Sequence, residues 1–219
     1  MRSLLPLIVS ALALGGVAQA QTPTRGAAAG PGNGYVEGVA QSAFGNVTSQ
    51  SYGAELGVTI TSGLQIFAEG GRIGNVATAD ITASAQVIAG FLSRAQNGTV
   101  SYSVKQPATL FAAGVRYLIP VTGSAQPYVM GGFGMAKVQQ QVAFLIGGTD
   151  VTSNLLQYGV TLGTDLSGDF TKPMLIVGGG VAWPVWQRLV LDFQYRYGRI
   201  MADEAITAQR AGIGVGVRF

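Results

Sequence analysis

The amino-acid sequence predicts an all-β fold, an eight-stranded antiparallel up-and-down β-barrel that spans a membrane, and three observations predict it. Only 11% of the residues are charged and 48% are hydrophobic, whereas ordinary globular domains carry about 25% charged residues. After residue 20 no apolar run reaches the roughly 18 residues that a membrane-spanning helix needs. Eight segments instead alternate in polarity with the period of a strand. A closed barrel satisfies every backbone group in lipid without helices.

The first twenty residues are expected to be a processing signal. Arg2 supplies a positive start, residues 4–17 an apolar run, and Ala18 and Ala20 a small-x-small cleavage site. The run is shorter than the roughly 20 residues of a transmembrane helix. We therefore expect an exported chain in which residues 21–33, rich in Pro and Gly, form a flexible lead-in to a barrel domain at residues 34–219.

The alternating segments are separated by links of two kinds. Three links are short, at residues 61–63, 120–126 and 184–188, and they are interleaved with four others that include the long links 75–106 and 139–172. Bacterial barrels have short periplasmic turns and longer outer loops, and an even number of strands returns both termini to the periplasm. The predicted strands are residues 34–41, 52–60, 64–74, 109–119, 127–138, 174–183, 189–199 and 207–219.

The two longest links leave alternatives open. Ile81, Ala85, Ile88 and Leu92 recur with helical spacing, which predicts one amphipathic helix over residues 79–95 outside the barrel wall. This helix either packs over the barrel mouth or serves as a ligand lid or partner-binding element. Residues 139–172 hold two more alternating runs, at 142–146 and 156–162. We favour a long exposed excursion there, with ten strands or a short helix at 150–156 as alternatives.

Charged residues alternate with apolar ones in the predicted strands. If Phe193 and Tyr195 face lipid, Asp192 and Arg196 must face the lumen. An Arg or Lys on the lipid face costs about 2–4 kcal/mol at mid-bilayer, which opposes a one-residue slip. The interior of an eight-stranded barrel is about filled by side chains, so we expect an ion-pair network that plugs the bore, with a polar or gated channel as the alternative. Its expected members are Glu37, Glu55, Glu69, Arg116, Lys137, Asp192, Arg196, Arg210 and Arg218.

The chain ends on an aromatic residue, Phe219, preceded at alternate positions by Ile213, Val215 and Val217. Together with the signal and the eight alternating segments, this end resembles the small outer-membrane barrels of the OmpA, OmpX, OmpW and opacity-protein kind over residues 34–219. The resemblance implies a bacterial outer-membrane location. It also implies that these four residues form the signal taken up by the barrel-assembly machinery, with outer-membrane lipid as the surroundings of a monomer. The aromatic girdles of such a barrel are expected to include Tyr117, Tyr128, Trp183, Trp186, Tyr195 and Tyr197.

Composition also limits the function. The 13 basic residues barely exceed the 10 acidic ones, so no nucleic-acid binding is expected. The sequence has neither His nor Cys, which removes the usual zinc and thiol chemistry, and the barrel enzymes of the outer membrane are understood to use histidine. We expect no catalytic residue, no metal, no cofactor and no enzyme activity. A structural or surface-presentation role is favoured, with a porin-like transporter of small or hydrophobic solutes, an adhesin or surface-recognition module, and a soluble exported barrel as alternatives.

Overall fold

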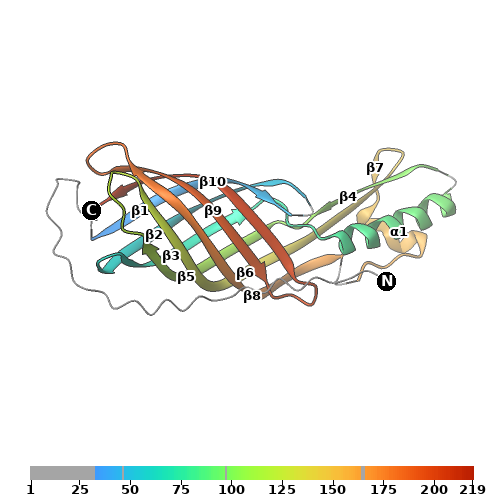
Figure 1. Cartoon of the computed structure of the whole chain (residues 1–219). Coiled ribbons are helices and arrows are strands. Elements are labelled where there is room, and N and C mark those ends of the chain that lie inside the picture. The colour runs from blue at the N-terminus through green and yellow to red at the C-terminus, as the bar shows by residue number, and fades with distance from the viewer. Residues whose placement is uncertain (1–32, 46, 97, 164–165) are drawn as a thin grey trace, which may run out of the picture.

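A computed structural model of the chain describes residues 33–45, 47–96, 98–163 and 166–219. The expected signal at residues 1–20, its cleavage site at Ala18 and Ala20, and the lead-in up to residue 32 lie outside the described residues. The described chain forms an antiparallel barrel with a smaller folded extension beyond one of its ends (Figure 1).

Eight strands close the barrel. β10 pairs with β1, and β6 pairs with β8, so every strand of the ring has two antiparallel neighbours. This confirms the predicted fold class and excludes a ten-stranded ring, because β4 and β7 pair only with the part of β6 that leaves the barrel. The ring runs through β1 (Gly34–Phe44), β2 (Ser49–Thr61), β3 (Leu64–Ile73), β5 (Ala108–Leu118), β6 (Gln126–Ile146), β8 (Ser167–Pro184), β9 (Leu189–Ile200) and β10 (Ile206–Arg218).

The two ends of the barrel differ in their connections. The three short connections lie at the proximal end. The first residue of β1, Gly34, and the residue after β10, Phe219, lie there too and exchange backbone hydrogen bonds of 3.0 Å. Gly63 turns β2 into β3 with a φ of 85°, a conformation that favours glycine. Both longest links leave from the opposite, distal end (Figure 1). The links thus divide between the ends as the sequence predicts.

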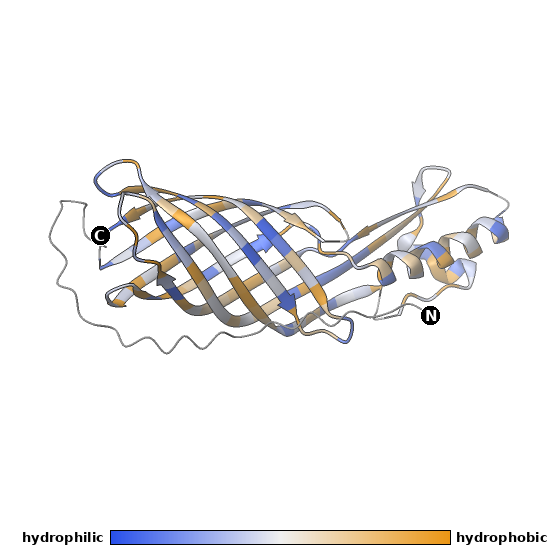
Figure 2. Ribbon diagram, in the orientation of Figure 1, coloured by the Kyte–Doolittle hydropathy of each residue, from blue (hydrophilic) through white to orange (hydrophobic). Residues whose placement is uncertain are grey.

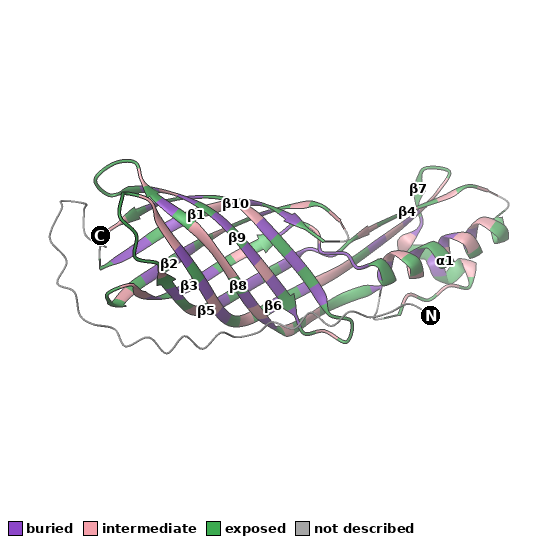
Figure 3. Cartoon of the chain, in the orientation of Figure 1, coloured by how far each residue is buried: buried purple, intermediate pink, exposed green. Residues whose placement is uncertain are grey.

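The two faces of the barrel wall follow the alternation of the sequence. On β9, the side chain of Phe193 is 52% exposed on the outside, while Asp192 and Arg196 are fully buried in the interior. Hydrophobic and hydrophilic residues alternate along the strands in Figure 2, and buried and exposed residues alternate along the same strands in Figure 3. The strands therefore turn their large apolar residues outward and most of their charges inward.

The extension, here called the distal subdomain, consists of α1 (Ala79–Gln96), β4 (Val100–Lys105), residues 141–146 of β6, β7 (Thr149–Asp150) and the 3-10 helix η1 (Thr152–Tyr158). β6 is its middle strand, paired with β4 and with β7. α1 lies alongside β4 (Figure 1). The subdomain has a core of its own, formed by Ala77, Ile81, Ala85, Ala89, Leu92, Val142, Phe144, Val151, Leu155 and Leu166.

The two long links fold more fully than the sequence indicates. The predicted helix at 79–95 is confirmed as α1, and the Thr78 hydroxyl accepts a hydrogen bond from the Ile81 N–H at 3.4 Å at its start. The alternating run 142–146 belongs to β6, whereas the run 156–162 forms no strand. The short helix lies at Thr152–Tyr158, and Val151 before it gives no side-chain cap.

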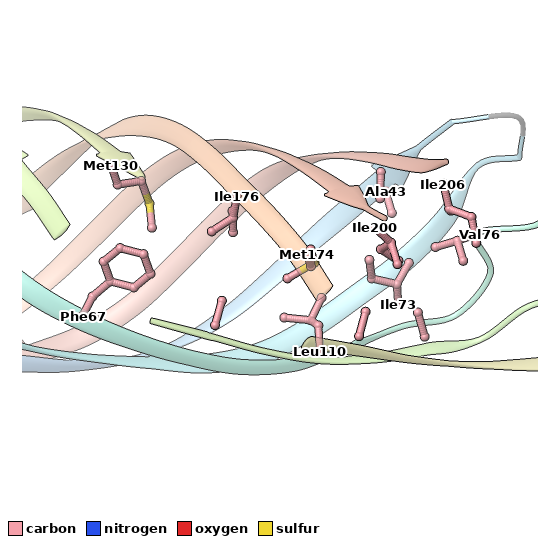
Figure 4. Close-up of a cluster of buried hydrophobic side chains, with 14 of the residues drawn as sticks. Ala43, Phe67, Ile73, Val76, Leu110, Met130, Met174, Ile176, Ile200 and Ile206 are labelled. Carbon is pink, nitrogen blue, oxygen red and sulfur yellow. The ribbon is translucent and has the colours of Figure 1, made fainter. Parts of the chain in front are cut away.

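An apolar cluster fills part of the barrel interior (Figure 4). It extends from Phe67 and Met130 in the barrel to Ile73, Ile200 and Ile206 near the distal strand ends, and all five are at most 5% exposed. The rest of the bore is lined by polar and charged side chains. Within the described residues, no helix has both the length and the apolar character needed to cross a bilayer.

Candidate functional site

Three carboxylates lie side by side on the inner face of neighbouring strands. In the antiparallel register Glu37 on β1 is opposite Glu55 on β2, and Glu55 is opposite Glu69 on β3. All three are at most 4% exposed. Like charges placed directly across a strand pair repel one another, and in a buried setting salt screens this repulsion much less than at the surface. The row therefore requires cations from the other side of the lumen.

Arg196 on β9 supplies the central cation. Its side chain is fully buried, and Nη2 lies 2.6 Å from Glu55 Oε2 and 3.9 Å from Glu37 Oε1. Nη1 contacts Glu69 Oε2. A guanidinium has five donors in a planar fork, so one arginine joins all three carboxylates of the row.

Arg116 on β5 forms a second centre in the same lumen. Nη1 lies 3.3 Å from Glu55 Oε1, and Nη2 lies 3.1 Å from Asp192 Oδ2. The guanidinium also lies over the ring of Tyr128, 3.5 Å from its centroid, and 4.7 Å from that of Tyr35. Both phenols join the network, since Tyr35 Oη donates to Glu55 at 2.6 Å and Tyr128 Oη donates to Asp192 at 2.8 Å.

Further contacts extend the network around the barrel wall. Arg210 on β10 binds Glu69 Oε1 at 2.9 Å. The amide of Gln194 donates to Glu37 at 3.4 Å and accepts from Gln41 at 3.1 Å. We call this set the ionic layer: Glu37, Glu55, Glu69, Asp192, Arg116, Arg196 and Arg210, with Tyr35, Tyr128, Gln41 and Gln194.

The family of the chain follows from a comparison with sequence families. The profile of the outer membrane protein beta-barrel domain matches residues 7–219. The chain belongs to this family. It is a bacterial outer-membrane β-barrel, and because the short turns of such barrels are periplasmic, its proximal end faces the periplasm and its distal subdomain the cell exterior.

Solved structures agree on the fold of this outer-membrane barrel. Neisserial surface protein A is 17% identical with a TM-score of 0.54, over 87% of this chain and 99% of that one. The N-terminal barrel domain of Pseudomonas aeruginosa OprF is 14% identical with a TM-score of 0.50, over 86% of this chain and 99% of that one. At such identities these likenesses show the fold alone. No curated protein sequence matches this chain significantly.

One residue of the expected lumen network lies elsewhere in the outer-membrane barrel. Lys137 is on the same outer face of β6 as Phe133, which is 71% exposed, and its Nζ pairs with Asp169 Oδ2 at 2.5 Å. Its assignment to the lumen was wrong because β6 carries apolar residues on both faces. Tyr128 lies on the inward face of β6, where its hydroxyl donates a hydrogen bond to Asp192.

Arg218, also expected in the network, lies at the periplasmic end of the barrel. Its Nη1 donates to Gln126 Oε1 at 2.7 Å, and no ion pair joins it to the carboxylates within the described residues. The other expected residues, four acids and three arginines, are brought together in the ionic layer. Ile213, Val215, Val217 and Phe219 share the outward face at the end of the chain, each between 44% and 61% exposed.

Sequence reasoning missed the neutral members of the ionic layer. Tyr128 was expected in an interface girdle, yet it is 2% exposed and lies inside the barrel. Tyr35, Gln41 and Gln194 were not selected either, although Tyr35 and Gln41 share the face of Glu37. The face that they share with Glu37 was the signal that could have identified them. Buried carboxylates have more acceptor positions than three arginines satisfy, so neutral donors on the same face are needed to pair with the rest.

Proposed function

We propose that this outer-membrane barrel is a closed anchor that presents its distal subdomain at the cell surface. The single observation that carries the proposal is the filling of the bore by the ionic layer together with the apolar cluster. The ionic layer joins side chains from opposite walls, and the apolar cluster fills the interior around it, with Ile206 on its distal side and Val190 on its proximal side. Between Tyr35, Arg116 and Arg218 the remaining cavity has a volume of about 10 Å³, which is room for about one water.

The distal subdomain supports the presentation part of the proposal. Its central strand is the continuation of β6, so a continuous hydrogen-bonded strand connects it to the wall. Its core contains fully buried Phe144 and Leu92, while Val87, Phe91 and Leu156 are 73%, 52% and 76% exposed. In this proposal Val87 and Phe91, one turn apart on α1, provide an exposed apolar contact surface for a partner. No group is nominated for catalysis, because the sequence has neither His nor Cys.

Conductance in planar lipid bilayers tests the closed bore. Purified protein reconstituted at high copy number is expected to give no stable stepwise conductance, while a sixteen-stranded porin prepared in the same way does. Stable steps from the purified protein would refute the plug and support the alternative of a polar channel.

Surface labelling tests the presentation. The chain contains no cysteine, so single cysteines report without background. Ser101→Cys in β4 and Ser124→Cys in the turn between β5 and β6 are both exposed positions at opposite ends of the molecule. In intact cells a membrane-impermeant maleimide is expected to label Ser101→Cys and to label Ser124→Cys only after the outer membrane is opened. The reverse pattern would refute the orientation.

The partners of assembly belong to the same proposal. The outward apolar face of β10 is proposed to contact lipid, and Phe219 to be read by the barrel-assembly machinery of a protein that works as a monomer. Phe219→Ala is expected to lower the amount of heat-modifiable protein in the outer membrane, whereas Phe44→Ala, at the distal end of β1, leaves it unchanged. Equal assembly of both variants would count against the assembly signal.

A further inference from the structure

A cavity of about 490 Å³ opens at the distal mouth of the barrel. Its walls come from the start of α1, from Gln106 between β4 and β5, from the distal parts of β6 and β8, and from the connection between β9 and β10 with the first residue of β10. This volume lies within the range of small-molecule sites, roughly 300–1,000 Å³. The cavity is separate from the ionic layer, so binding of a ligand there does not require a conducting bore.

Four of the nine described acidic residues line this cavity. The sequence has 10 acidic residues, and Asp165 lies in the undescribed pair 164–165. Of the described ones, four are in the ionic layer and Asp150 stands apart on β7. The remaining four, Asp80, Asp169, Asp203 and Glu204, all line the cavity. Lys172 is the single cationic residue that lines it with them.

Two of these carboxylates have no cationic partner in the described chain. Asp169 pairs with Lys137 at 2.5 Å and Asp203 with Lys172 at 3.6 Å. Asp80 and Glu204, both exposed at the cavity, form no ion pair with any described residue. The rim therefore keeps a net negative charge, which raises the local concentration of cations at the cavity.

The wall of the cavity holds an unpaired hydrogen-bond donor. Gln106 is 2% exposed, and its Oε1 accepts the Thr78 backbone N–H at 3.1 Å. Because an N–H needs an acceptor, this bond fixes the orientation of the amide and leaves Nε2 as the free end. Nε2 has no hydrogen-bond partner among the described residues, and Gln106 lines the cavity.

An unpaired acceptor and an apolar surface complete the cavity. Gln140 also lines it, and its Oε1 is buried without a hydrogen-bond partner in the described chain. Ile81, Phe170 and Ile206 contribute apolar side chains to the same walls. Since buried amide groups normally have partners, the free donor and acceptor select a ligand that carries a complementary polar group.

We propose that this cavity binds a small organic cation, an amine with an apolar body and an uncharged hydrogen-bonding group. The ammonium lies at the rim near Asp80 and Glu204, the apolar body packs against Phe170 and Ile206, and the uncharged polar group bonds to Gln106. A metal ion is a poorer match, because no group of acidic residues with the spacing of a metal site occurs in the described chain.

Calorimetric titration of the full protein in lipid nanodiscs tests this inference. Tyramine is the probe, because it combines an ammonium, an aromatic ring and a hydroxyl. 4-Ethylphenol, which lacks the charge, and 3-(4-hydroxyphenyl)propionate, which reverses it, are the comparison compounds. Tyramine is expected to bind saturably with one molecule per chain, at least tenfold more tightly than either comparison compound.

Variants locate the binding. Asp80→Asn combined with Glu204→Gln is expected to weaken tyramine binding at least tenfold, since both residues are exposed and their substitution leaves the fold intact. Asp150→Asn removes a carboxylate outside the cavity and is expected to leave the affinity unchanged. Absence of saturable tyramine binding, equal binding of the three compounds, or an equal loss in Asp150→Asn would each overturn the inference.

Discussion

Arg196 offers the sharpest test of the ionic layer. Arg196→Met keeps a long apolar stem but removes the guanidinium that contacts all three carboxylates of the row, whereas Arg116 and Arg210 each contact one of them. Removing one partner from a buried ion pair costs about 3–5 kcal/mol, because it leaves an uncompensated charge in the interior. With three fully or nearly buried carboxylates affected, we expect a loss at the upper end of this range, a large fraction of the 5–15 kcal/mol typical of folded proteins.

Urea-induced unfolding of the barrel in detergent micelles measures this loss. Trp183 and Trp186, both near the periplasmic end, report the transition by fluorescence, and heat modifiability on a gel reports the closed barrel. Arg94→Met on the exposed surface of α1 is the matched control, with an expected change within about 0.5 kcal/mol. A free energy of unfolding for Arg196→Met that equals the control value would refute the argument.

A second substitution separates charge from packing. If the cost of Arg196→Met comes from uncompensated carboxylates, adding Glu55→Gln to it removes one of them and recovers part of the stability. The coupling between contacting sites is expected to be about 0.5–3 kcal/mol. Strict additivity of the two substitutions would attribute the loss to packing alone.

The remaining predictions concern other parts of the molecule. Gly114→Ala is expected to cost about 1–3 kcal/mol in urea unfolding, because a Cβ there would overlap the Gly131 carbonyl oxygen, while Gly38→Ala, with no atom within 4 Å of its Cβ, is neutral. Phe144→Ala leaves a cavity in the subdomain core, which is expected to lower the stability of the subdomain by about 3–5 kcal/mol. It should speed hydrogen exchange in α1 without loss of heat modifiability. Phe193→Arg, outward on β9, is expected to cost about 2–4 kcal/mol in lipid. Hydrogen bonds from the Thr152 side chain and backbone lower the pKa of Asp150. The turn that the ionised Asp150 stabilises is therefore intact above the ordinary aspartate pKa. It opens as the pH falls through the lowered pKa of Asp150, and the Thr152 amide signal in NMR should report this opening.

The barrel wall could be predicted because the two faces of each strand have opposite surroundings, lipid on the outside and polar side chains in the lumen. Phe193 and Asp192 cannot exchange faces without placing a charge in lipid and a phenyl ring among carboxylates, so alternation alone gives the register of β9. The same reasoning fails on β6, where both faces are apolar over much of the strand. There Lys137 was assigned to the wrong side, and the position of Tyr128 is decided by its hydrogen bond to Asp192.

The distal subdomain lay beyond sequence reasoning for a different reason. The helical period of Ile81 and Leu92 predicts α1 itself, but its partner surface comes from residues 141–146, far along the chain. β4 is only six residues long and becomes a strand through its pairing with β6. The cavity at the mouth likewise joins α1 to the connection between β9 and β10. Contacts between residues so far apart in the sequence leave no local pattern that shows which segments pair.

The ionic layer affects the register of the barrel more directly than its net stability. Buried ion pairs are weak evidence for stability, since well-packed apolar groups of the same volume often do as well. A one-residue slip of β9, however, would turn Arg196 and Asp192 to the lipid and leave Glu37, Glu55 and Glu69 without their central cation. An apolar lumen would oppose the same slip far less, because exchanging apolar residues between lipid and core costs little. The charges therefore penalise the wrong registers, and the apolar cluster around them contributes packing.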